Sequence, residues 1–423
     1  MRRSVFGAVV AAAACLLAGC ASRPATTRPA PVTAPTVARG VAYVEPAVNP
    51  APYGAADTEF GLDVLHAWCQ ADPDANLVFS PAVLASALGL AYLGAKGATA
   101  TAMAGVLHLP ARSRGAQLAG LAARLAALRA VNGPGATLAA SDYVWADPAL
   151  PPLKAYLDDV ATGYDAGVGQ APFQADPARA AAEINQAISR DTRGQIPQLV
   201  TPGLVSGMGW VLTSALYMDA RWATPFDPGQ TSGGTFTTQP GTAVTAQYMH
   251  SSQPVRSNAV DGWTGAWLPY DGGTLGMLAI LPPAGAGSCA VPSASGLAAL
   301  TRAVLTSQGP GALIGLPKLD ISATARMDDE LKALGMAQAF GPAADFTALS
   351  PQAANIGFVQ QSATLKVDEK GTVGAAAAAV GVAPADAFAG RELDFNRPYL
   401  LLVTDRQTGE PLFLATVANP AQG

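Results

Sequence analysis

The residue types that most often carry out catalysis form no recognisable set in this sequence. Its three histidines, His66, His108 and His250, belong to no His-Glu-x-x-His zinc pair, and no Gly-x-Ser-x-Gly elbow accompanies them. The segment 89–96 differs from a phosphate-binding loop because Ala95 separates its last glycine from the lysine. We therefore expect the protein not to be an enzyme, and we expect no bound metal or cofactor.

The N-terminus has the features of a secretory signal that ends at a cysteine. Two arginines precede an uncharged run from Val5 to Gly19, which is typical of a secretory signal and too short for a membrane span. The last residues, Leu-Ala-Gly-Cys at 17–20, resemble the bacterial lipobox, in which the cysteine is lipidated. We expect a signal peptide at 1–19 and lipidation of Cys20. Because Ala21 follows rather than an aspartate, the resemblance implies export to the outer membrane, on its periplasmic or its external side.

The residues that follow are typical of a tether. Residues 20–54 are rich in alanine, proline, threonine and valine, so they predict an extended connection between lipid and domain. Two further cysteines, Cys69 and Cys289, lie in the body of the protein. In an oxidising compartment they either pair or remain as two buried thiols, and their spacing leaves both states open.

The composition is that of a folded protein. Half of the 423 residues are hydrophobic, 13% are charged and the net charge is −5. These values exclude a disordered tail and argue against nucleic-acid binding, which requires a basic face. Helical spacing of apolar residues occurs at 57–70, 83–107 and 117–131. Strand-like stretches follow at 137–145, 208–218, 274–281, 356–367, 399–404 and 411–417. Together they predict one α+β domain over 55–423.

Twelve segments, in order, resemble the serpin family across 57–423. They are Asn76–Pro81, Leu93–Thr99, Asn185 with Thr192–Ile196, Ser214–Met218, Trp222, Pro225–Asp227, Leu316–Lys318, Leu334–Met336, Ala344–Phe346, Val367–Thr372, Phe395–Tyr399 and Pro411–Phe413. The resemblance implies a serpin fold of three β-sheets and about nine helices. It also implies an exposed reactive loop over about 369–394, in a protein that is a monomer and touches the membrane only through its lipid.

An inhibitory serpin is a suicide substrate. A serine protease attacks the reactive loop and forms a covalent acyl-enzyme, and the cut loop then inserts into the central sheet as a new strand. The protease is dragged along and its oxyanion hole and triad are distorted, which slows hydrolysis by several powers of ten. The resemblance therefore implies a metastable native fold whose strain is released by cleavage. The alternative is a non-inhibitory serpin, a carrier or chaperone-like protein that is cut without trapping.

The composition of the loop suits insertion. The resemblance assigns Glu369, Lys370 and Gly371 to the hinge. In an inserted strand alternate side chains enter the core, and small uncharged residues can do so whereas a charge or a proline cannot. The face that would enter carries only small residues, namely Thr372, Gly374, Ala376 and Ala378.

The reactive bond is placed by counting from the hinge. The count gives Ala385-Asp386, with Ala387-Phe388 as an alternative because the loop is about two residues longer than in a common vertebrate member. The segment 382–385 (Val-Ala-Pro-Ala) is typical of substrates of elastase-type enzymes, whose specificity pocket is small. We therefore expect an elastase-like or subtilisin-like serine protease as the target.

The resemblance assigns further supporting positions in the sheet. Trp222 and Lys318 match the breach, where the loop enters, and Lys318 is the expected partner of Glu369. The shutter, where the strands part, is matched by Ser80, Ser214 and Gln361. The last two differ from the asparagine and histidine usual in the family, and the second helix serine of the shutter is replaced by Val83. Ser214 and Gln361 have the groups to bond to each other.

Overall fold

The computed structural model describes residues 35–133, 135–239, 241–372 and 391–422. The signal peptide and Cys20 lie outside the described residues. So do Gly374, Ala376, Ala378 and both candidate reactive bonds.

Three β-sheets form the framework of the described residues. In spatial order, the seven-stranded sheet contains β1 (Thr36–Ala38), β4 (Val168–Gln170), β3 (Ala136–Ala146), β5 (Trp210–Arg221), β14 (Gly371–Thr372), β13 (Val359–Asp368) and β12 (Leu319–Arg326). The six-stranded sheet contains β2 (Leu77–Phe79), β17 (Pro411–Val417), β16 (Tyr399–Asp405), β10 (Leu275–Leu281), β9 (Trp263–Pro269) and β8 (Arg256–Val260). The four-stranded sheet contains β15 (Arg391–Asp394), β11 (Ala312–Pro317), β7 (Ala243–His250) and β6 (Ser232–Thr237).

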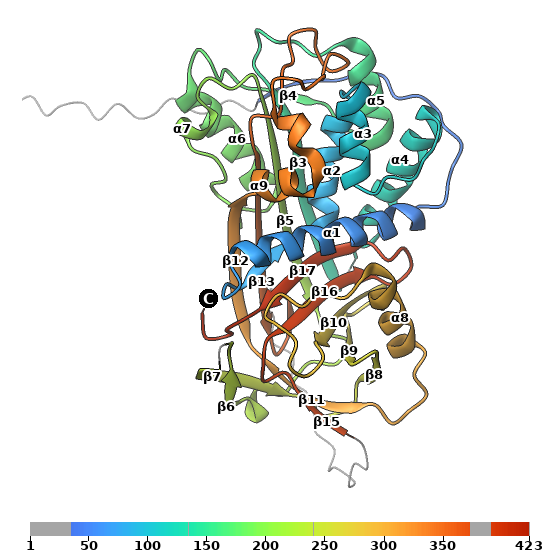
Figure 1. Cartoon of the computed structure of the whole chain (residues 1–423), viewed down its shortest axis with the longest axis vertical. Helices are drawn as coiled ribbons and strands as arrows, with labels where there is room; N and C mark the ends of the chain where they lie inside the picture. The colour runs from blue at the N-terminus through green and yellow to red at the C-terminus, as the bar shows by residue number, and fades with distance from the viewer. Residues whose placement is uncertain (1–34, 134, 240, 373–390, 423) are drawn as a thin grey trace, which may run out of the picture. The chain divides into compact units, whose positions relative to one another are not determined.

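Nine α-helices occur within the described ranges (Figure 1). They are α1 (Ala51–Ala71), α2 (Pro81–Tyr92), α3 (Gly97–Val106), α4 (Arg114–Ala130), α5 (Lys154–Tyr164), α6 (Pro177–Asp191), α7 (Pro202–Val205), α8 (Ala294–Leu305) and α9 (Asp328–Leu331). Short 3₁₀ segments lie at Pro228–Gln230 and Ala337–Phe340, and a π turn lies at Lys332–Met336. The expected α+β architecture of three sheets and about nine helices is confirmed.

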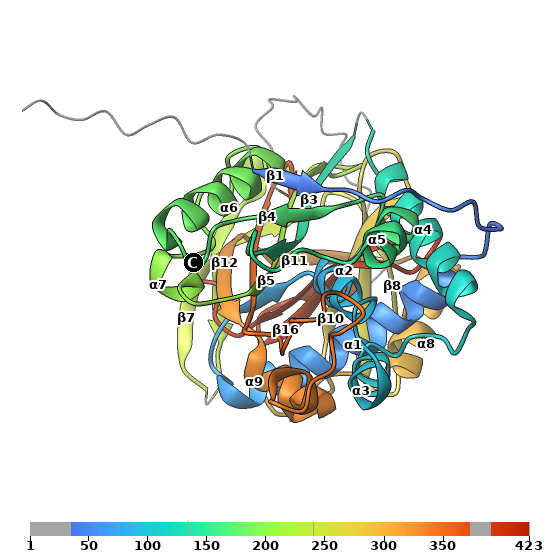
Figure 2. The same cartoon turned by 90° about the horizontal axis from the view of Figure 1, so that it is seen from above.

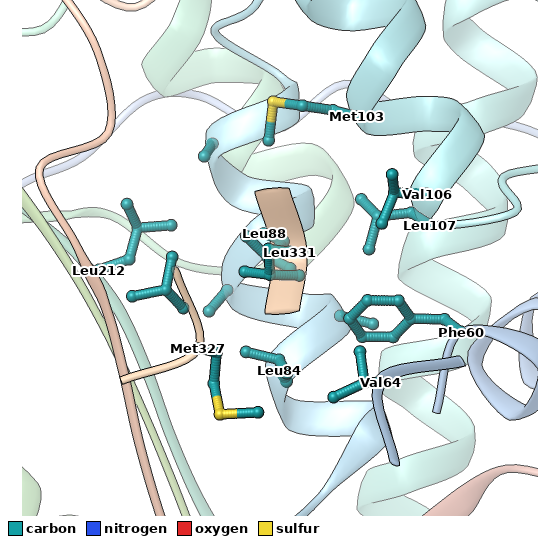
Figure 3. Close-up of a cluster of buried hydrophobic side chains, with 14 of the residues drawn as sticks. Phe60, Val64, Leu84, Leu88, Met103, Val106, Leu107, Leu212, Met327 and Leu331 are labelled. Atoms are coloured by element: carbon teal, nitrogen blue, oxygen red, sulfur yellow. The ribbon is translucent and has the colours of Figure 1, made fainter. Parts of the chain in front are cut away.

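Helix α2 is the central helix of the fold. Ser80 caps it, with its side chain accepting from the Val83 amide, and Pro81 occupies its first turn. It is apolar on every side, and eleven of its twelve residues are buried. Figure 3 shows Leu84 and Leu88 of α2 among Phe60 and Val64 of α1 and other buried side chains. Each such side chain contributes about 1.5–3 kcal/mol through burial. Helix α2 therefore joins the helical layer to the seven-stranded sheet.

Two local differences from the sequence-based expectation have clear causes. The helical spacing at 83–107 is divided between α2 and α3, because the chain turns at 93–96, where Gly94 packs against Leu349. The expected tether over 20–54 is part of the fold from residue 36 onward. Strand β1 pairs with β4, and α1 already begins at Ala51, with Tyr53 buried against Gly120.

Cys69 and Cys289 form a disulfide. It joins α1 to the segment between β10 and α8, and the two residues are 220 positions apart in the chain. A link across so long a segment restricts the unfolded chain strongly and typically stabilises a fold by about 2–4 kcal/mol. The sequence left open whether the two cysteines pair or remain as thiols, and in the structure they are paired.

Candidate functional site

The first residues of the expected reactive loop lie between two strands of the seven-stranded sheet. Gly371 and Thr372 form β14, which pairs antiparallel with β13 on one side and antiparallel with β5 on the other. Thr372 lies opposite Ala220 of β5 and opposite Val367 of β13. Farther along the sheet, β5 and β13 pair directly with each other, in parallel, over Val359–Ala363 and Leu212–Leu216. The sheet is therefore forked, with β14 in the fork.

Gly371 is required by the close approach of the strands at this fork. A Cβ atom at this position would lie 2.1 Å from the carbonyl oxygen of Ala220. Even alanine would push β14 away from β5. The amides of Lys370 and Gly371 both donate to the Asp368 carboxylate, which fixes the turn from β13 into β14. The sequence analysis assigned Gly371 to the hinge but did not predict this contact.

Glu369 is fixed in place by a cation and a hydroxyl group. Lys318 Nζ donates to its two carboxylate oxygens at 3.0 and 2.8 Å, and Thr231 Oγ1 donates to Oε1 at 2.8 Å. Desolvation acts to raise the pKa of Glu369, but the hydrogen bonds from Lys318, its own backbone and Thr231 outweigh it and hold the pKa below its ordinary 4.5. The ionised carboxylate therefore stabilises the turn before β14.

Trp222 covers the end of the sheet where β14 enters. Its indole N–H donates to the Asp368 carbonyl at 2.9 Å, and its backbone N–H donates to the Lys370 carbonyl at 2.9 Å. Its ring stacks on Tyr270, with 4.6 Å between centroids and 7° between planes. The Tyr270 hydroxyl in turn hydrogen-bonds the buried hydroxyl of Thr372. Hydrogen bonds from Trp222 and Tyr270 therefore hold the hinge through its backbone and through the Thr372 side chain.

The three shutter residues lie near the direct β5–β13 pairing but do not form one network. Gln361 lies opposite Ser214 in the ladder, yet its side chain donates to the Val78 carbonyl at 3.4 Å, a long bond. Ser214 lies opposite Asp142 of β3 on its other side, where its hydroxyl acts to lower the pKa of that carboxyl group. The Ser214–Gln361 bond that the side chains allow is absent from the described residues. Ser80 serves as the cap of α2.

Asp142 is the site residue that the sequence analysis missed. Burial raises its pKa well above the ordinary value, although Arg124 and the bond from Ser214 oppose this effect. Its Oδ1 atom is buried and makes no hydrogen bond with any described residue. A charged residue in the middle of a stretch expected to be a strand, 137–145, was the available signal.

Two of the three histidines contact neighbouring polar side chains. His108 lies beside Asp63 and Glu59, and His250 contacts Ser232 at 3.3 Å. Within the described parts of the chain, no three His, Cys, Asp or Glu residues are grouped so that they would hold a metal ion. In the same ranges, no helix has the length and apolar character needed to cross a bilayer.

Comparison with known proteins assigns this fold to a family. The family model described as serpin (serine protease inhibitor) matches residues 55–420. An uncharacterized serpin-like protein of Thermococcus kodakarensis is 31% identical over 353 residues, 82% of each chain. The chain belongs to the serpin family. Serpins are protease inhibitors and not enzymes.

Two further proteins define the range of the similarity. Plasminogen activator inhibitor 1 of Neovison vison is 29% identical over 380 residues, which cover 86% of this chain and 92% of that protein. The thermophilic serpin tengpin in its native state superposes with a TM-score of 0.79 at 21% identity, covering 92% of this chain and all of that one. The latter similarity concerns the fold alone.

The ion pair at the hinge predicts a pH-dependent stability. Because the folded-state pKa of Glu369 lies below 4.5, its contribution is complete above that pH and is lost as the pH falls through the folded-state pKa. Lys318→Met keeps the apolar stem and removes the charge. We expect it to lower the stability by about 0.5–1 kcal/mol at about pH 7, since the lysine is partly exposed.

Thermal unfolding at about pH 7 and about pH 3.5 measures this effect. The difference between the wild type and Lys318→Met should shrink toward zero at the lower pH. Lys366→Met is the matched control, because Lys366 lies on the same sheet and faces Asp320 at 3.6 Å in an exposed pair. A Lys318→Met effect of the same size at both pH values would contradict the assigned role of the pair.

Proposed function

We propose that the protein is an inhibitory serpin that traps a serine endopeptidase covalently. The observation that carries this proposal is the position of β14, which lies between the two strands that a cut loop would have to separate. Insertion would extend a strand that already exists, because Gly371 and Thr372 already pair with both β5 and β13. Continued pairing in the same register would carry the rest of the loop along β5.

The register defines which residues would enter. With Thr372 opposite Ala220, the positions of β5 from Asp219 down to Trp210 would meet loop residues 373–382. Every one of these loop residues is a valine, a glycine or an alanine. The first proline after them is Pro384 and the first charge is Asp386, and both lie beyond the end of β5. The length and composition of the loop therefore match the strand that would receive it.

The energetics also favour insertion after cleavage. Opening the fork breaks one parallel ladder of five residue pairs between β5 and β13. The inserted loop replaces it with two antiparallel ladders, which is the more stable kind of pairing. Each added hydrogen bond contributes about 0.5–1.5 kcal/mol net. Insertion is then favourable, and an uncut loop is prevented from completing it because both of its ends are held in the fold.

The target that we propose is an elastase-like or subtilisin-like protease acting at Ala385-Asp386, with Ala387-Phe388 as the alternative bond. A small residue before the bond fits a small specificity pocket. The second candidate function is a non-inhibitory serpin. What favours it is the shutter, where the long Gln361 bond and the unpartnered Asp142 oxygen replace a continuous polar network.

Reaction with an elastase tests the inhibitory function and the bond together. We expect a covalent band near the summed masses of protease and serpin on a reducing denaturing gel, because the acyl-enzyme survives denaturation. Ala385→Arg should transfer complex formation to a trypsin-like protease. If this variant gains nothing against trypsin and still traps elastase, the assigned bond is wrong. Cleavage without any complex, by several elastases, would support the non-inhibitory candidate.

The alternation of the inserted strand gives a second test. Ala376→Glu would bring a charge to the inward face that Thr372 begins, which costs several kcal/mol. Ala377→Glu is the matched control, since the same charge would lie on the opposite face. We expect Ala376→Glu to be cut like a substrate with at least a tenfold loss of complex, and Ala377→Glu to retain trapping. Equal loss in both variants would contradict insertion in this register.

We further propose that the chain is exported, lipidated at Cys20 and anchored to the outer membrane. The support is the positive, short apolar N-terminus ending in Leu-Ala-Gly-Cys. The full chain, produced in a bacterium fed a labelled fatty acid, should incorporate label and partition into detergent. Cys20→Ser should abolish both, whereas Cys15→Ser should leave them unchanged. Labelling that persists in Cys20→Ser would refute the proposal.

A further inference from the structure

Exposed apolar side chains are concentrated on one short segment between β1 and α1. Four large hydrophobic side chains are exposed in the described part of the chain, and three of them, Val41, Tyr43 and Val44, lie within four consecutive positions. Val44 is fully exposed. The fourth is Leu153, the residue before α5. Single exposed apolar residues are ordinary, but a concentration of them marks a contact surface. We refer to residues 41–44 as the apolar segment.

The backbone of the apolar segment is fixed on the body of the protein. Strand β1 pairs with β4 just before it. The backbone N–H groups of Val41 and Tyr43 donate to Asp158 Oδ1 and Thr162 Oγ1 of α5, each at 2.8 Å. Figure 2 shows β1 beside β4 and the chain after it passing α5 and α4. The exposed side chains are therefore carried by a backbone that already has partners.

The charges that border the apolar segment favour an anionic surface. Glu45, which follows it, lies against Gly115 in the first turn of α4, where a Cβ atom would be 2.9 Å from its carboxylate. The helix dipole favours an anion there, so this charge is directed at the protein. Lys154 is exposed and pairs with Asp158 at 2.6 Å. Arg39 is exposed and forms no ion pair with any described residue. Exposed cations beside apolar side chains are typical of surfaces that contact anionic lipids.

The length of chain that precedes β1 indicates a bilayer as the partner. About 15 residues separate Cys20 from Thr36, and an extended chain spans at most ~3.3–3.6 Å per residue, so the two can be no more than about 50 Å apart. If β1 were not docked, the first fixed element would be α1, about 30 residues and up to about 100 Å from Cys20. The β1–β4 pairing therefore halves the tether and keeps the apolar segment near the anchor.

We propose that the apolar segment is a membrane-contacting surface and that its partner is the bilayer that holds the lipid anchor. Its valines and Tyr43 enter the interfacial region, where aliphatic and aromatic side chains beside cations are stabilised. This inference rests on the lipidation of Cys20 proposed above and not on the trapping of a protease. Figure 1 shows α4 and α5 at one end of the described body and β15 at the other. The contact therefore turns the four-stranded sheet and the hinge away from the bilayer, where a protease can approach them.

Quenching of a fluorophore by membrane lipids tests this surface. In the lipidated full chain, Val44→Cys provides one reactive thiol, because Cys69 and Cys289 are paired and the signal is removed. The thiol is labelled with NBD, and the chain is floated on vesicles of phosphatidylethanolamine and phosphatidylglycerol that contain a lipid with a nitroxide near its headgroup. We expect the nitroxide to remove about half of the fluorescence, because interfacial segments lie about 5–10 Å deep.

Thr245→Cys is the matched control. Thr245 is exposed on β7 of the four-stranded sheet, and a label there should lose less than about a tenth of its fluorescence. In the chain labelled at position 44, Tyr43→Asp should lower the quenching at least about twofold, because a charged side chain opposes entry into the bilayer. Thr245→Asp in the same labelled chain should leave it unchanged.

Flotation separates a failure of the anchor from a failure of the surface. If the chain does not float, the proposed anchor is wrong and the surface falls with it, because nothing then holds a bilayer within reach. If the chain floats and the labels at 44 and 245 are quenched equally, or Tyr43→Asp has no effect, the membrane contact alone is refuted. Fluorescence at position 44 that depends on chain concentration without vesicles would assign the segment to a second copy, and would also overturn the proposal.

Discussion

The short parallel ladder between β5 and β13 is the constraint on which the rest of the structure depends. It contains five residue pairs, whereas β3 pairs with β5 over eleven. If β5 and β13 paired along their whole length, this ladder would continue to the ends of both strands. Instead Gly371 and Thr372 lie between the two strands beyond Ala363, so β5 and β13 are already apart where β14 enters. The direct β5–β13 ladder therefore ends where the loop starts.

The contacts around β14 fix the start of the loop. The backbone amides of Trp222 and Phe226 donate to the carbonyls of Lys370 and Glu369, and Lys318 neutralises the Glu369 carboxylate. These bonds fix the turn into β14 but do not cross the direct β5–β13 ladder. In the proposed inhibitory function they would hold the hinge in place and leave the two strands free to separate. A native state of that kind would persist because of a barrier and not only because of its free energy.

The sequence predicted the fold well and the environment of the site only in part. Motifs in order along the chain identified the family, because each reflects a local requirement such as the cap at Ser80 or the glycine at 371. The pairing of Glu369 with Lys318 was inferred from the family resemblance, and both residues lie together in the structure. The contact between Ser214 and Asp142 was not predicted, because it depends on the register of β3 against β5. The docking of β1 on β4 was missed for a similar reason, since a proline-rich composition does not show which sheet edge is free.

The strongest covalent and ionic links lie where they do not oppose opening. The disulfide joins α1 to the segment between β10 and α8, and Arg124 of α4 binds both Asp57 of α1 and Glu410 beside β17 at 2.5 and 2.9 Å. All three charged side chains are buried, and desolvation raises the pKa of Asp57 well above its ordinary value. Removal of one charged partner from such a buried cluster is costly, because it leaves the others unpaired. The cluster therefore links α1 and α4 to the six-stranded sheet. Neither link connects β5 to β13. Both links lie where the six-stranded sheet meets the helices, so the strand separation required by the proposed function breaks neither of them.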